Sequence, residues 1–157
     1  MIKVIGIDPG LAATGVGVVS GSRLKVHSFS YGSINTSKKH SLPNRLEQIF
    51  SGISSVIKDE TPELMVVEDI FSLRENPKSG ISLGKVSGVI LLAGCKAGVP
   101  VVEIPAREAK QIITGNGNAS KAQLEEAVRS YLNLHDPIRP FHASDAIAMA
   151  LIGLFRS

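Results

Sequence analysis

Cysteine is almost missing from this chain. Its 157 residues include a single cysteine, Cys95, so no disulfide can form within the chain. That excludes the disulfide-stabilised frameworks of small secreted proteins and favours a reducing compartment. Cys95 lies in an apolar stretch, residues 89–98, and we expect it to be an ordinary buried core residue.

Long hydrophobic runs are also missing. No uninterrupted apolar run approaches the roughly 18 residues that a membrane-spanning helix needs. Lys3 and Asp8 interrupt the first residues, so there is no apolar segment of the kind found in a secretory signal. The sequence therefore predicts a cytoplasmic protein that does not enter a membrane.

The overall composition lacks any strong bias. Charged residues make up 20% and hydrophobic residues 43%, which is ordinary for a globular protein and unlike a disordered one. The length is typical of one domain, and we expect residues 1–157 to form a single domain. The net charge of +3 suits a polyanionic partner without establishing one.

The periodicity of apolar residues predicts strands first and helices afterwards. Three β-rich segments predict an antiparallel meander whose last strand lies at a sheet edge, and two later apolar runs predict buried strands. This order indicates a mixed sheet with helices on its faces. The expected strands are residues 2–7, 14–20, 22–34, 64–67 and 99–104. The expected helices are residues 41–58, 80–96, 105–113, 121–132 after a Ser120–Gln123 capping box, and 142–155.

Three acidic residues stand at or near the ends of apolar elements. Asp8 ends the first expected strand, Glu68 ends the fourth, and Asp145 lies one turn into the last helix. If the first and fourth strands pair in parallel, Asp8 and Glu68 meet at one sheet edge, where open α/β sheets place their ligands. Residues 146–155 carry no charge, so the Asp145 carboxylate must lie near the core boundary.

Close carboxylates need a proton or a cation. At about 4 Å two of them repel by roughly 4 kcal/mol at an effective dielectric of 20, and oxygen ligands suit Mg²⁺ or Mn²⁺. His142 lies three residues before Asp145, on the same helical face, where an imidazole can bind metal or transfer a proton. Alternatively, Glu68 is a solvated strand end, Asp8 a turn residue and His142 a residue of the helix start.

Four stretches, in this order and spacing, resemble the RuvC family of Holliday-junction resolvases along nearly the whole chain. They are GIDPGLAATGVGVV, VVEDIF, PAREAKQIITGNGNASKAQ and HASDAIAMALI. Four ordered matches are far more specific than one short motif. The resemblance implies an α/β, ribonuclease H-like fold: a five-stranded mixed sheet, in the strand order 3-2-1-4-5, flanked by helices.

The resemblance also implies a metal-dependent reaction. Asp8, Glu68 and Asp145 match the metal-binding acids of the family, and His142 stands where many members carry another aspartate. It implies two Mg²⁺ ions, with Mn²⁺ as a substitute, that activate water and stabilise the leaving oxygen, giving 5′ phosphate and 3′ hydroxyl ends. Whether His142 is a metal ligand or a general base stays open.

DNA contacts are expected on both sides of these acids. Phe71 matches a family aromatic that contacts bases at the junction, although without the family it could equally be a loop anchor. Lys110 and Lys121 match basic residues that are important in the family. Other basic residues are weaker candidates for phosphate contacts, because they could be ordinary solvated side chains: Arg74, Lys78, Lys85 and Arg107.

A homodimer and further partners are expected as well. Gly80, Gly84 and Gly88 recur every four residues and lay a smooth strip along one helix. Tight packing within the monomer is the alternative, but a two-fold junction needs two symmetric cuts, and the family is dimeric through this region. By the resemblance, the partners are a four-way DNA junction, a second copy of the chain, and the RuvA and RuvB branch-migration proteins.

Three other functions compete with junction resolution. A nucleotide-binding protein of the actin-like ATPase or sugar-kinase type can also contain a strand ending in Asp-Pro-Gly, but it needs two lobes and a longer chain. An inactive DNA-binding module would not need all three acids. A ribonuclease H-like nuclease acting on RNA is separated from a junction resolvase only by Phe71, the glycine-rich 115–118 loop and the full-length resemblance.

Overall fold

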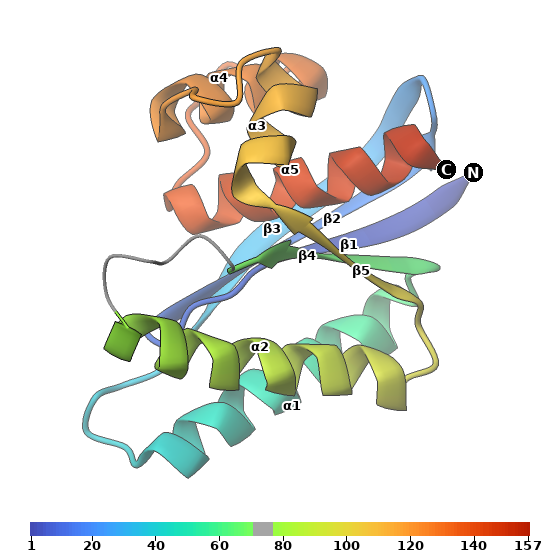
Figure 1. The fold of residues 1–157 in the computed structure, drawn as a ribbon. Helices are drawn as coiled ribbons and strands as arrows, with labels where there is room; N and C mark the ends of the chain where they lie inside the picture. Colours follow the sequence, from blue (N-terminus) through green and yellow to red (C-terminus); the bar gives the residue numbers. More distant parts are fainter. Residues whose placement is uncertain (71–76) are drawn as a thin grey trace.

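The computed structural model describes residues 1–70 and 77–157, and five strands and five helices form in these ranges. Figure 1 shows how they are arranged. The strands are β1 (Ile2–Asp8), β2 (Ala13–Ser22), β3 (Lys25–Asn35), β4 (Leu64–Asp69) and β5 (Val101–Pro105). The helices are α1 (Leu42–Glu60), α2 (Pro77–Lys96), α3 (Ala106–Thr114), α4 (Lys121–Leu132) and α5 (Phe141–Arg156). Each predicted element is present, with ends shifted by a few residues.

The strands form one mixed sheet in the order β3-β2-β1-β4-β5, as predicted. β1 pairs antiparallel with β2 and parallel with β4, and β5 continues the parallel half. β3 lies at the edge, as expected. In the β1–β4 register Ile7 lies opposite Val67, so the two following residues, Asp8 at the end of β1 and Glu68 one residue before the end of β4, lie at the same edge of the sheet.

Helices cover both faces of the sheet (Figure 1). On one face, α1 and α2 pack their apolar sides against β1, β2 and β4, in a core that contains Ile5, Ile53 and Ile90. On the other face lies α5, with α3 and α4 outside it, in a core that contains Val128 and Ile147. Within the described residues no helix is long and apolar enough to cross a membrane.

The helix ends follow local sequence signals. Ser120 accepts a hydrogen bond from the Gln123 amide while the Gln123 side chain accepts one from the Ser120 amide, so the predicted capping box is confirmed. Gly115, at φ 78°, ends α3 in the left-handed conformation that glycine tolerates. Pro105 precedes the first turn of α3 as its N-cap instead of lying within it.

Cys95 is not a core residue, and that prediction is wrong. The side chains of α2 that are buried against the sheet include Val86, Ile90 and Ala93, whereas Cys95 is exposed. At 3.6 residues per turn, two positions past Ala93 lie on nearly the opposite side of the helix. The apolar stretch around Cys95 misled the prediction because both faces of this part of α2 carry apolar residues.

Three glycines let α5 lie unusually close to the sheet. A Cβ atom at Gly6 of β1 would collide with the α5 backbone at Ala146 and Ala150. At Gly15 of β2 it would collide with the backbone of His142, and at Gly17 it would lie 2.7 Å from the Ile147 amide nitrogen. α5 itself is buried from Ala143 to Leu154. The helix backbone therefore rests directly on the strands.

We expect Gly6→Ala to lower the free energy of unfolding by about 1–3 kcal/mol, because a methyl group there must displace the helix backbone. Gly32→Ala in β3 is the matched control, since a Cβ there meets nothing within 4 Å, and its effect should stay within about 0.5 kcal/mol. Urea unfolding measures both. Equal stability of the two variants would contradict the close packing of α5.

Candidate active site

Two of the predicted acids lie at the carboxyl ends of neighbouring parallel strands. Asp8 ends β1 and is only 6% exposed. Glu68 lies near the end of β4 and is half-buried, and it shares a side-chain hydrogen bond with Asp8. Parallel pairing brings the carboxyl ends of both strands together. The prediction that Asp8 and Glu68 meet at one sheet edge if these strands pair in parallel is therefore confirmed.

The first turn of α5 brings the other two residues to the same place. Gly15 lies opposite Asp8 in the β1–β2 ladder, and the His142 backbone rests on it. The His142 Nδ1 atom lies 2.9 Å from the Asp8 Oδ2 atom, close enough for the imidazole N–H to donate a hydrogen bond to the carboxylate. Asp145 follows one turn later and is 6% exposed.

Burial and mutual repulsion disturb the ionisation of these acids. Burial, the hydrogen bond to Asp8, and the negative charges of Asp8 and Asp145 raise the pKa of Glu68 to about 9. Burial and the Asp8 charge raise the pKa of Asp145 to about 6. The hydrogen bond to Asp8 raises the pKa of His142. Burial and mutual repulsion thus both favour the protonated, uncharged forms of Glu68 and Asp145.

One carboxylate oxygen in this cluster has no partner among the described residues. Asp145 Oδ1 is buried and accepts no hydrogen bond from residues 1–70 or 77–157. A buried oxygen of this kind costs free energy unless something outside the chain binds it. In the described part of the chain, no three His, Cys, Asp or Glu side chains already converge on a single ion position.

Lys121 and Lys110 lie beside the acids. Lys121 is the first residue of α4, and its charge lowers the pKa of Glu68 and of Asp145. Lys110 of α3 acts on Asp145 in the same direction but more weakly. Both lysines are therefore close enough to the acids for their charges to act on them, and their contact with DNA stays a prediction.

The other predicted DNA-binding residues have different surroundings. Arg107 donates from Nη1 to the Asn118 side-chain oxygen at 3.0 Å, so this guanidinium holds the 115–118 loop. Lys78 is exposed near the start of α2 and lines a cleft with Leu11 of the β1–β2 turn, whereas Lys85 is exposed further along α2. Phe71 and Arg74 lie outside the described residues.

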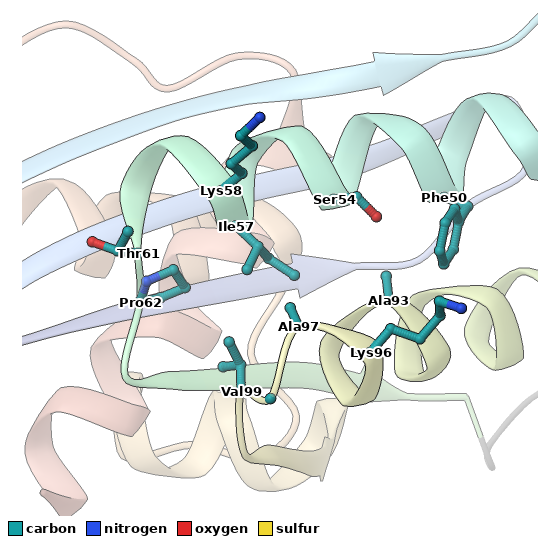
Figure 2. Close-up of a pocket in the computed structure, with 11 residues that line it drawn as sticks. Phe50, Ser54, Ile57, Lys58, Thr61, Pro62, Ala93, Lys96, Ala97 and Val99 are labelled. Carbon is teal, nitrogen blue, oxygen red and sulfur yellow. The ribbon is translucent and has the colours of Figure 1, made fainter.

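A cavity of about 600 Å³ lies elsewhere, between the carboxyl ends of α1 and α2 (Figure 2). Its walls include Phe50, Ile57 and Val99, and Lys58 and Lys96 also line it. α1 ends just before β4 begins, so this cavity lies toward the amino end of β4, away from Glu68. It contains none of the predicted site residues.

Gly15 contributes to the site but was not singled out from the sequence. It allows the His142 backbone to approach the end of β1, which a side chain at this position would prevent. A glycine inside a strand pattern is a sign that another backbone approaches closely. The alternation Gly15-Val16-Gly17 in the expected second strand carried that signal.

Known proteins match the chain over nearly its whole length. The family model described as "Crossover junction endodeoxyribonuclease RuvC" matches residues 4–153. The RuvC of Citrifermentans bemidjiense is 38% identical over 148 residues, which are 94% of this chain and 89% of the relative. The RuvC of Geobacter sulfurreducens is 41% identical over 152 residues, covering 96% and 90%.

A solved structure agrees with the sequence relatives. Thermus thermophilus RuvC in complex with a Holliday junction substrate superposes with a TM-score of 0.92 and 32% identity, covering 99% of this chain and 94% of that one. The expected ribonuclease H-like fold is thereby confirmed. The chain belongs to the RuvC family of crossover junction endodeoxyribonucleases.

Proposed function

We propose that this chain resolves Holliday junctions in recombination and repair by paired, symmetric nicks, using Asp8, Glu68, His142 and Asp145 as its active site. The observation that carries the proposal is the meeting of these four side chains at one sheet edge, in a chain that matches RuvC over residues 4–153. The products are expected to carry 5′ phosphate and 3′ hydroxyl ends.

The donor set fits Mg²⁺, with Mn²⁺ as a substitute. The three acids supply hard oxygen ligands, and Asp145 Oδ1 is buried with no hydrogen-bond partner in the part of the chain that the structure describes, so it is free to bind a cation. A divalent charge would offset the burial and the carboxylate repulsion that together help to raise the pKa of Glu68 to about 9. We propose two ions per site, which would together activate a water molecule and stabilise the leaving oxygen.

His142 is oriented by Asp8. Its Nδ1 atom is occupied by the Asp8 carboxylate, so Nε2 is the nitrogen that can accept a proton from water or bind a metal ion. The side chain is 43% exposed, which leaves it accessible from solvent. Both roles need the imidazole held in this orientation, and the Asp8 contact supplies it.

Basic residues around the acids are proposed to hold the DNA. Lys110 and Lys121 lie beside the site and are expected to bind phosphates near the cleaved bond, with Lys78, Lys85 and Arg107 further out. Phe71 and Arg74 are proposed as the base wedge and a further phosphate contact. RuvA and RuvB are the expected partners, and DNA as the substrate suits a cytoplasmic location.

A homodimer through α2 is proposed to supply the second cut. Gly88 and Leu92 are exposed on one side of this helix, Ile81 lies on the same side with 63% of its surface exposed, and a Cβ at Gly88 would meet nothing within 4 Å. Gly88 therefore does not serve packing on the monomer's own sheet. An exposed apolar helix face with small residues suits a two-fold partner helix.

Leu92→Glu is expected to dissociate the dimer, raising its dissociation constant at least tenfold, because a carboxylate would be buried in the apolar contact. Leu24→Glu, at a turn residue that is 94% exposed, is the control and should leave the dimer intact. Sedimentation equilibrium measures both. If Leu92→Glu stays dimeric, the interface lies elsewhere.

The stability of the metal-free protein is expected to fall as pH rises. Folding raises the pKa of Glu68 from 4.5 to about 9, so between these pH values the folded chain binds more protons than the unfolded chain. The free energy of unfolding therefore decreases as pH rises through this range. Glu68→Gln cannot ionise and should flatten this decline, leaving the variant at least about 1 kcal/mol more stable at pH 8. Urea unfolding in chelator tests this, and parallel profiles would contradict it.

Cleavage is expected on a four-way junction with Mg²⁺ or Mn²⁺, and not in chelator. Asp8→Asn should lower the rate at least a hundredfold while junction binding persists, because it removes a metal ligand without removing the basic residues. End-labelled junction, linear duplex and an RNA–DNA hybrid are compared, and products are mapped to the nucleotide. Preferential cleavage of the RNA–DNA hybrid would instead indicate a ribonuclease H-like nuclease that acts on RNA.

A further inference from the structure

A buried carboxylate joins α4 to the segment that leads into α5. Glu125 lies one turn after Lys121 on α4, and its side chain is only 3% exposed. Its Oε1 atom accepts a hydrogen bond from the Ile138 backbone amide at 2.8 Å. A carboxylate buried this deeply costs free energy unless it is paired. The groups that pair with Glu125 therefore indicate its structural role.

Arg129 pairs with Glu125 and makes a second contact with the segment that leads into α5. Its Nε atom lies 2.7 Å from Glu125 Oε1, in a close ionic contact whose N–H is not aligned for a hydrogen bond. Its Nη1 atom donates to the His135 carbonyl at 3.3 Å. Arg139 approaches from the segment itself, with Nη1 3.8 Å from the same Glu125 oxygen. Two charged residues on α4 thus hold residues 133–140, here called the 133–140 connection.

The 133–140 connection determines where α5 begins. Pro140 is the N-cap of α5 and makes no side-chain capping hydrogen bond, so the helix start has no polar anchor of its own at that residue. Ile138 is fully buried, and its amide is the group that Glu125 holds. His142 and Asp145 follow within the first two turns of α5.

α4 also reaches the site directly, through its first residue, Lys121. Lys121 and Glu125 share one face of α4, a single turn apart, and Lys121 lies beside the acids. A hydrogen bond to one particular amide fixes the position of the connection along α4, whereas apolar contacts alone would permit sliding. The buried carboxylate therefore defines the position of the 133–140 connection, although removing its charge from water costs free energy.

We propose that Glu125 is a positioning residue for junction cleavage: by holding the Ile138 amide against α4, its carboxylate sets His142 and Asp145 relative to Lys121. This inference rests on the proposed metal-binding roles of His142 and Asp145. Glu125 itself touches neither substrate nor metal. Its loss should impair the assembled site more than it impairs DNA binding.

The test compares Glu125→Ala, Glu125→Met and Glu125→Gln with the wild type. Methionine fills the space without accepting the Ile138 hydrogen bond, so it keeps the test valid if the alanine variant does not fold, and glutamine retains an acceptor. Three quantities are measured below the unfolding temperature of every variant: the single-turnover cleavage rate at saturating enzyme and Mg²⁺, the junction dissociation constant in chelator, and the Mn²⁺ dissociation constant by calorimetry.

We expect the alanine and methionine variants to cleave at least tenfold more slowly and to bind Mn²⁺ at least threefold more weakly. Their junction binding should stay within threefold of wild type. Glu125→Gln should remain within threefold of wild type in all three measurements. Ile53→Ala, which removes a buried side chain from the opposite face of the sheet, is the control for general destabilisation and should also cleave within threefold.

Two results would overturn the proposal. One is wild-type cleavage by both Glu125→Ala and Glu125→Met. The other is an equal loss of cleavage and Mn²⁺ binding in Ile53→Ala at a matched loss of thermal stability, which would reduce the effect to destabilisation. Asp145→Asn is measured in parallel: if it cleaves normally, the proposed metal site has failed, and if it is inactive while both apolar Glu125 variants cleave normally, only the inference about Glu125 has failed.

Discussion

The contact between α5 and the first two strands is the constraint on which the candidate active site depends. Gly6, Gly15 and Gly17 carry no side chains, so the helix backbone can rest on β1 and β2. That contact places the first turn of α5 over the end of β1, where Asp8 lies. A helix held further from the sheet by ordinary side chains would carry His142 away from Asp8 and leave the carboxylates in separate places.

This packing has an electrostatic consequence. Asp8 and Asp145 are each 6% exposed and Glu68 is half-buried, so water screens their repulsion poorly. The chain tolerates the cost because α5 is buried along most of its length in an apolar core on this face of the sheet. Apolar packing elsewhere thus offsets the unfavourable electrostatics of the site. The same electrostatics favour the binding of a group from outside the chain that neutralises the acids, as a divalent cation would.

Local sequence signals predicted the elements well, because most of these segments carry their own periodicity and caps. The capping box at Ser120 is an example, since both partners lie within four residues. Cys95 shows the limit: an apolar stretch does not reveal which face of a helix meets the sheet, and Cys95 faces away from it. Glu125 is the reverse case, an acidic residue that is buried and held by partners up to fourteen residues away.

The sequence by itself determined the order of strands and helices, the chemical type of the site residues, and the family, since these depend on local patterns and on four ordered motifs. Only the tertiary structure decided that Asp8 contacts His142, residues 134 positions apart, and that Asp145 keeps a buried oxygen with no partner among the residues described. The physical reason is that such contacts arise from strand register and from how closely a helix approaches a sheet. Both are set by packing across the whole core and by no single segment.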